Sequence, residues 1–221
     1  MTLLASLVSA FFLAQASPVQ TLPPDTTRVV RGFGGQQFAW GTAGLRNGKQ
    51  LKAYLPASAT GVDMLVTYYL TSPDGSPSPK PKFLPVDEVQ WMRVRGQYSA
   101  LLKAKKREPG RIGARRVAGP VELYVVKAAP APTTSFLGPT PVLSAPATST
   151  QTNGPEAVSW YLRRADGTLV LVTPENFARQ VSAFLADDAE LARRVAAGQP
   201  GHGPAELEAL IRQYNERARS R

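Results

Sequence analysis

Residue types suited to nucleophilic or metal chemistry are scarce in this 221-residue chain. It contains no cysteine, which excludes disulfides, thiolate metal sites and a cysteine nucleophile. Its single histidine, His202, excludes a multi-histidine metal site built within one chain. His202 stands between two glycines just before an expected helix, and this setting favours an exposed turn over a general base.

Carboxylates are the remaining candidates for catalysis or metal binding. Asp187, Asp188 and Glu190 lie together, but N-capping and the helix dipole both favour acids at a helix start, so we expect capping here. A glycosidase needs two suitably spaced carboxyl groups. The candidates for such a pair are Asp63, Asp87, Glu88 and Glu122. We expect a non-enzymatic protein without catalytic residues, metal or cofactor, and the alternative is a carboxylate-dependent hydrolase acting on a polymeric substrate.

Positive charge is the strongest chemical signal in the sequence. The formal net charge is +10, and residues 28–127 hold 17 basic against 6 acidic residues. The densest part contains the candidate anion-binding residues Lys103, Lys105, Lys106, Arg107, Arg111, Arg115 and Arg116. Basic clusters attract polyanions whatever their sequence, but we expect a solvated surface loop between two strands here, and the alternative is binding of an anionic envelope polymer or lipid headgroups. Residues 103–116 include no aromatic side chain to stack on bases, so we expect no sequence-specific nucleic acid.

The first residues predict export to the periplasm, the outer envelope or the extracellular space. Residues 3–13 form an apolar run, and Ala14-Gln15-Ala16 matches a small-x-small cleavage pattern. The run is shorter than the roughly 20 residues that span a bilayer, and no later segment approaches that length. We assign residues 1–16 to a signal peptide and 17–27 to a spacer; a buried N-terminal helix is the alternative.

Residues 28–127 predict a basic, β-rich module. Asn47-Gly48 tolerates the positive φ angles of a tight turn and therefore predicts a hairpin. Expected strands cover residues 42–46, 49–55, 64–70, 89–94 and 121–126. Residues 97–103 fit either a strand or a helix, and the proline-rich residues 71–82 predict a long polar loop.

Residues 128–157 predict a disordered linker, and residues 158–221 a second module. The linker combines many prolines with Ala, Ser and Thr and has no charge before Glu156. Asp166-Gly167 then predicts a second hairpin, and Thr173-Pro174-Glu175 predicts a helix start. Two apolar stripes should cover this hairpin: Phe177, Val181, Phe184 and Leu185 on one helix, and Leu207, Leu210, Ile211 and Tyr214 on the last. The expected fold is α+β: a β-rich module, a Pro/Ala/Thr linker, and a hairpin covered by two to three helices.

Several short motifs occur in a characteristic order along the chain: Asn47-Gly48-Lys49 in the first hairpin, Glu122-Leu123-Tyr124, Tyr161-Leu162-Arg163-Arg164, Asp187-Asp188 and Tyr214-Asn215. In these motifs the chain resembles a group of uncharacterised exported proteins of Bacteroidota. The likeness extends over roughly residues 28–219 and is one of pattern. The resemblance implies export and this architecture, but no catalytic residue. The lack of catalytic motifs together with this architecture leads us to expect an envelope-associated interaction or structural role.

The export hypothesis predicts a mature chain that begins near Ser17 and is found outside the cytoplasm. Intact-mass measurement of the protein made in its own host should show the loss of residues 1–16. Retention of Met1 would contradict the hypothesis.

Overall fold

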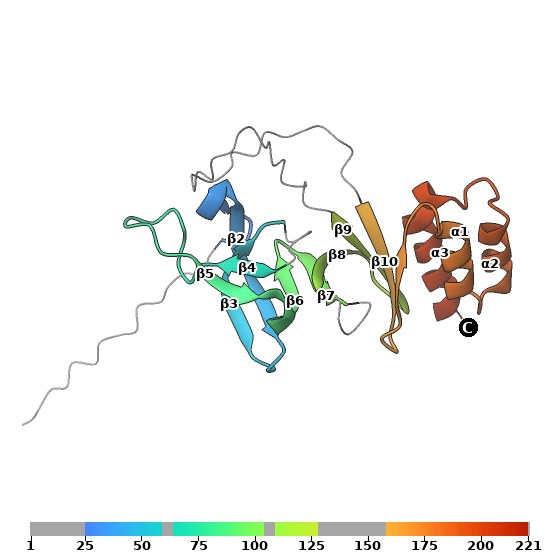
Figure 1. The fold of residues 1–221 in the computed structure, drawn as a ribbon, viewed down its shortest axis with the longest axis horizontal. Helices are drawn as coiled ribbons and strands as arrows, with labels where there is room; N and C mark the ends of the chain where they lie inside the picture. Colours follow the sequence, from blue (N-terminus) through green and yellow to red (C-terminus); the bar gives the residue numbers. More distant parts are fainter. Residues whose placement is uncertain (1–24, 59–63, 104–108, 128–157, 221) are drawn as a thin grey trace, which may run out of the picture.

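The computed structural model describes residues 25–58, 64–103, 109–127 and 158–220. A large antiparallel sheet and three C-terminal helices make up this part of the chain, which confirms the α+β class (Figure 1). The predicted signal peptide, most of the spacer and the predicted linker lie outside the described residues. No helix in the described ranges is long and apolar enough to cross a membrane.

The main sheet has the strand order β1-β2-β6-β7-β8-β9-β10-β11. β1 and β6 pair with successive parts of one edge of β2, and β3 pairs along its opposite edge. Its strands are Val29–Arg31 (β1), Gln37–Leu45 (β2), Gln50–Pro56 (β3), Val89–Val94 (β6), Gln97–Leu102 (β7), Arg111–Val117 (β8), Val121–Lys127 (β9), Val158–Arg164 (β10) and Leu169–Val172 (β11). A small second sheet pairs β4 (Leu65–Tyr68) with β5 (Lys82–Pro85), and a bridge between Tyr54 and Tyr69 ties it to β3. Short 3-10 turns are η1 (Phe33–Gly35), η2 (Val86–Glu88) and η3 (Pro204–Glu206).

Both predicted hairpins are confirmed. Gly48 turns the chain between β2 and β3 with φ of +79°, and Gly167 does so between β10 and β11 with φ of +88°. These are backbone conformations that glycine adopts without steric cost. The ambiguous segment after residue 96 is a strand, β7, which pairs with both β6 and β8.

The C-terminal hairpin extends the N-terminal sheet. The sequence predicts two modules joined by a linker, and the structure pairs the last strand of the first with the first strand of the second. β9 and β10 form seven antiparallel residue pairs, from Lys127 opposite Val158 to Val121 opposite Arg164. The residues before and after the predicted linker therefore belong to one continuous sheet.

Three helices cover one face of this extension: α1 (Phe177–Phe184), α2 (Ala189–Ala196) and α3 (Leu207–Arg219). The predicted apolar stripes are buried there together with Leu162 and Val172 of the hairpin, and also with Val121 and Leu123 of β9. The helix start predicted at Thr173-Pro174-Glu175 is wrong by one turn. The Asn176 side chain accepts a hydrogen bond from the Thr173 backbone N–H at 2.8 Å, and α1 begins only after it.

Asn215 joins α3 to the start of β9. Its Oδ1 accepts from the Val121 backbone N–H at 2.9 Å, and its Nδ2 donates to the Val121 carbonyl at 2.7 Å. The side chain is 3% exposed, so these bonds satisfy polar groups that water does not reach. Gly119 leaves room for the amide, because a Cβ there would lie 2.6 Å from Asn215 Nδ2.

Replacing Asn215 by Ala should lower the free energy of unfolding by about 2 kcal/mol, because both backbone groups of Val121 lose their partner. Chemical denaturation measures the loss. Glu216→Ala, at the exposed neighbouring position of α3, is the matched control and should change stability by less than about 0.5 kcal/mol. Equal stability of the two variants would contradict this role of Asn215.

Candidate functional site

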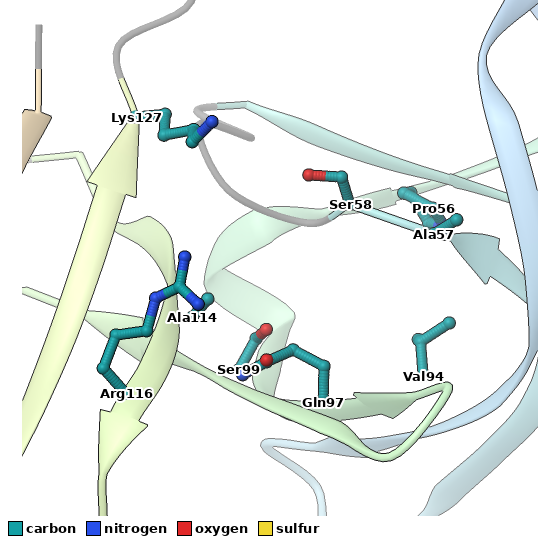
Figure 2. A pocket seen from close by; sticks show the side chains of 9 residues that line it. All are labelled: Pro56, Ala57, Ser58, Val94, Gln97, Ser99, Ala114, Arg116 and Lys127. Carbon is teal, nitrogen blue, oxygen red and sulfur yellow. The ribbon is translucent and has the colours of Figure 1, made fainter. Parts of the chain in front are cut away.

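A pocket of about 220 Å³ opens on the sheet where β3, β6, β7, β8 and β9 approach one another (Figure 2). Its lining combines two cations, polar uncharged groups and small apolar side chains. The lining residues are Pro56, Ala57, Ser58, Val94, Gln97, Ser99, Ala114, Arg116 and Lys127. None of them carries a carboxylate, so the pocket combines cations with hydrogen-bonding groups.

Strand alternation explains why the pocket exists. Side chains two apart on a strand share a face, so Ile112, Ala114 and Arg116 of β8 point the same way. Ile112 is buried in the core beneath the N-terminal strands. The β8–β9 register then shifts between Arg115 and Val117, and Val117 joins the core beneath the helices. The pocket residues Ala114 and Arg116 therefore lie between the two hydrophobic cores, on the same face of the sheet.

The two cations enter the pocket from adjacent strands. Arg116 is exposed, and no ion pair among the described residues involves its guanidinium. Figure 2 shows Arg116 and Lys127 extending toward the space bounded by Ser58 and Gln97. Ser99, which is 3% exposed, forms part of the floor opposite Ala114. This arrangement suits a small anionic group, since a carboxylate, phosphate or sulfate pairs with cations and accepts hydrogen bonds from hydroxyl and amide groups.

Only one of the described anion-binding candidates lines this pocket. Arg116 does so, whereas Lys103 pairs with Asp87 at 3.3 Å and Arg115 pairs with Glu122 at 2.7 Å. Arg111 is half-buried on β8 and has an interaction partner. The other candidates, Lys105, Lys106 and Arg107, lie outside the described residues. Sequence reasoning missed Lys127, because no spacing pattern links the end of one strand to the middle of its neighbour.

The opposite face of the same strands carries a continuous stack of rings and charges. The Trp91 ring stacks on Tyr98, with ring centroids 6.2 Å apart, and the Arg115 guanidinium lies 4.1 Å from the Tyr98 centroid. Glu122 then joins Arg115 to Arg163 of β10, with its Oε2 2.6 Å from the Arg163 guanidinium. The neighbouring residues Arg115 and Arg116 thus point to opposite faces, one into the stack and the other into the pocket.

Glu122 remains ionised within this stack. Burial opposes ionisation, but hydrogen bonds from Arg115, Arg163 and the Tyr124 hydroxyl outweigh it and lower the pKa of Glu122 below its usual value. Burial, together with the Glu122 carboxylate, raises the pKa of Tyr124. A carboxylate held in its charged form by two arginines is a poor general acid, because it gives up no proton near neutral pH.

Two further carboxylates proposed for the alternative hydrolase, Asp87 and Glu88, are described and do not line the pocket either. Asp87 pairs with Lys103, and Glu88 is exposed at the end of η2. Asp63 lies outside the described residues. Within the described ranges, no group of three or more His, Cys, Asp or Glu side chains is placed to hold a metal ion.

The other singled-out polar residues have structural partners. Asp188 accepts a hydrogen bond from the Leu191 backbone N–H at 3.1 Å, which confirms that it caps α2. Asp187 binds Arg164 of β10 at 2.8 Å and accepts from the Tyr214 hydroxyl of α3. His202 Nδ1 lies 3.1 Å from a backbone carbonyl in the turn before η3.

No protein-family model, curated protein or solved structure matches this chain. The geometry of the pocket and the charges that line it therefore provide the evidence for function.

The stack at Glu122 makes stability depend on pH in a defined direction. Because the pKa of Glu122 is lower in the folded state, its ionised carboxylate stabilises the fold at pH values above the ordinary Glu pKa of 4.5. This stabilisation is lost as the pH falls through the folded-state pKa. Glu122→Gln should lower the free energy of unfolding by about 1–2 kcal/mol at neutral pH and by much less at about pH 3.

Denaturation curves measured across this pH range check the prediction. Glu208→Gln is the matched control, because Glu208 pairs with Arg212 at the exposed surface of α3 and should contribute about 0.5 kcal/mol or less. A loss at Glu122 that is independent of pH would contradict the assignment.

Proposed function

We propose that the protein is a non-enzymatic binding module that holds an anionic group between Arg116 and Lys127. One observation carries the proposal: these two cations extend into one pocket, and no described residue of its lining carries a carboxylate. The Arg116 guanidinium forms no ion pair within the described ranges, so its charge is available to a ligand, whereas Lys103 and Arg115 are paired with Asp87 and Glu122.

The size of the pocket points to one charged group at a time. A volume of about 220 Å³ is below the range of about 300–1,000 Å³ typical of drug-sized ligands. A phosphate, sulfate or carboxylate group fits such a space, with the rest of the ligand lying outside. An anionic polymer meets this description, because each repeating unit presents a charged group on a short stem.

The export hypothesis supplies the setting for such a ligand. An exported protein encounters acidic polysaccharides of the cell envelope, and the net charge of residues 28–127 favours approach to any polyanion. We therefore propose an acidic envelope polymer as the ligand and an envelope-associated role for the protein.

The test uses a Gln substitution at both pocket cations, R116Q/K127Q, and polygalacturonate as the probe. Affinity at low salt should fall by about tenfold or more, and the slope of log K against log salt should become shallower by about one to two, because two ionic contacts are lost. Binding is measured by titration calorimetry at several salt concentrations.

Two controls separate the pocket from general positive charge. Arg193→Gln removes an exposed arginine on α2 and should leave binding unchanged. K105Q/K106Q/R107Q removes three charges from the predicted basic segment. The proposal is wrong if the pocket variant binds like Arg193→Gln, or if only the segment variant loses affinity.

A further inference from the structure

Exposed hydrophobic side chains gather at one end of the molecule. Of the six large hydrophobic side chains exposed among the described residues, five lie on η1 or around the β4–β5 sheet. These five form the apolar patch: Phe33, Met64, Leu65, Leu70 and Phe83. Figure 1 places β4 and β5 at the end of the molecule opposite the three helices. Single exposed hydrophobics are common on protein surfaces, but a concentration of them marks an interaction site.

The β4–β5 sheet explains how the patch forms. Val66 and Leu84 are paired and point into the N-terminal core. Alternation sends Leu65 and Phe83 to the other face, where they are 53% and 50% exposed. A small antiparallel sheet with one solvated face normally carries polar residues there. This sheet is therefore apolar on both faces.

An aromatic contact joins η1 to the same surface. The Phe33 ring meets the Phe83 ring edge-on, with centroids 6.0 Å apart, although Phe33 is 59% exposed. Gly34 and Gly35 follow with positive φ angles, so the backbone turns sharply immediately after Phe33 and leaves it at the tip of a turn.

Among the described residues, every charged residue within three sequence positions of a patch member is basic. Arg31 precedes Phe33 by two residues. Lys82 directly precedes Phe83 at the exposed end of β5, where alternation points its side chain to the face opposite Phe83. Lys80 lies in the loop before β5, and all three side chains belong to exposed residues. No ion pair within the described ranges involves them. The acid of that loop, Asp74, is paired with Arg28 at 2.5 Å.

We propose that the apolar patch and its cationic neighbours dock this end of the protein on an anionic lipid surface. Phe33, Leu65 and Phe83 enter the boundary between headgroups and acyl chains, while the cations meet the lipid phosphates. Interfacial binding draws on both contributions, because buried apolar area and attraction to anionic lipid add.

The exposed cations near the apolar patch favour an anionic lipid surface as its partner. Reversible binding to a lipid surface needs only a few inserted side chains together with basic residues. This surface is separate from the Arg116–Lys127 pocket, and the inference does not rest on the proposed function.

The test measures partition of the chain from Ser17 onward, which contains every described residue and lacks the apolar run of residues 3–13. The probe is vesicles of equal parts phosphatidylcholine and phosphatidylglycerol, compared with phosphatidylcholine alone. F33S/F83S should lose about tenfold or more in partition to the mixed vesicles. Leu171→Ser is the matched control, because Leu171 is the remaining exposed large hydrophobic, 38% exposed on β11, and it should leave partition unchanged.

Charge and pocket variants separate this surface from the proposed ligand pocket. R31Q/K80Q should reduce partition to the mixed vesicles and weaken its salt dependence, with no effect on phosphatidylcholine vesicles. R116Q/K127Q should partition like the wild type. A loss in R116Q/K127Q together with wild-type partition of F33S/F83S would place lipid binding at the pocket and overturn the inference.

Fluorescence quenching measures directly whether the side chain at position 83 inserts into the lipid. In Phe83→Trp, lipids brominated on the acyl chains should quench more fluorescence than they do in the wild type, because the new indole reaches the bromine atoms. If F33S/F83S unfolds, Leu65→Ser on the neighbouring strand repeats the partition test. The inference is overturned if Phe83→Trp shows no added quenching, or if Leu65→Ser and F33S/F83S partition like the wild type. It is also overturned if the wild-type chain does not bind the mixed vesicles at low salt.

Discussion

β9 is buried along most of its length, so its backbone groups need hydrogen-bond partners along both edges, and β10 supplies the second edge. Most of the C-terminal architecture depends on this pairing. It gives the helices a sheet face that includes Val121 and Leu123, and it brings Arg163 beside Glu122. Asn215 strengthens the same junction, because it satisfies both backbone groups of Val121 at the point where β9 begins.

One sheet therefore carries two hydrophobic cores, and the pocket lies where one ends and the other begins. Ile112 belongs to the first core and Val117 to the second, with Ala114 and Arg116 between them. A sheet face at such a boundary lacks apolar cover, so polar and charged side chains are accommodated there without the cost of burial. On the reverse face, Arg115 fixes the same stretch of β8 through Tyr98 and Glu122, which holds the backbone beneath Arg116 in place.

Features set by neighbouring residues were predictable, and those set by distant pairing were not. Asn47-Gly48 and Asp166-Gly167 encode their turns locally, and Asp188 caps the helix that follows it. α1 begins three residues beyond the predicted start, because Thr173 and Asn176 close a separate turn through an Asn176 N–H to Thr173 carbonyl bond of 3.2 Å, and the helical bonding pattern begins only at the Asn176 carbonyl. Neither the β9–β10 pairing nor the convergence of Arg116 and Lys127 leaves a periodic signal in the sequence. The segment from Met64 to Leu70 reads as an ordinary strand, and only the pairing with β5 shows that Leu65 faces outward.

The β9–β10 pairing also means that non-covalent contacts, and not only the peptide chain, hold the two parts of the sheet together. Residues 31 to 43 positions apart in sequence are paired in the sheet. Seven residue pairs, the Asn215 bonds and a shared core join the two parts without relying on the peptide chain between Lys127 and Val158. A break in the backbone within that interval would therefore leave two fragments that still recognise each other. The junction has the properties of a split protein, in which an N-terminal fragment offers the open edge of β9 and a C-terminal fragment completes it by strand addition.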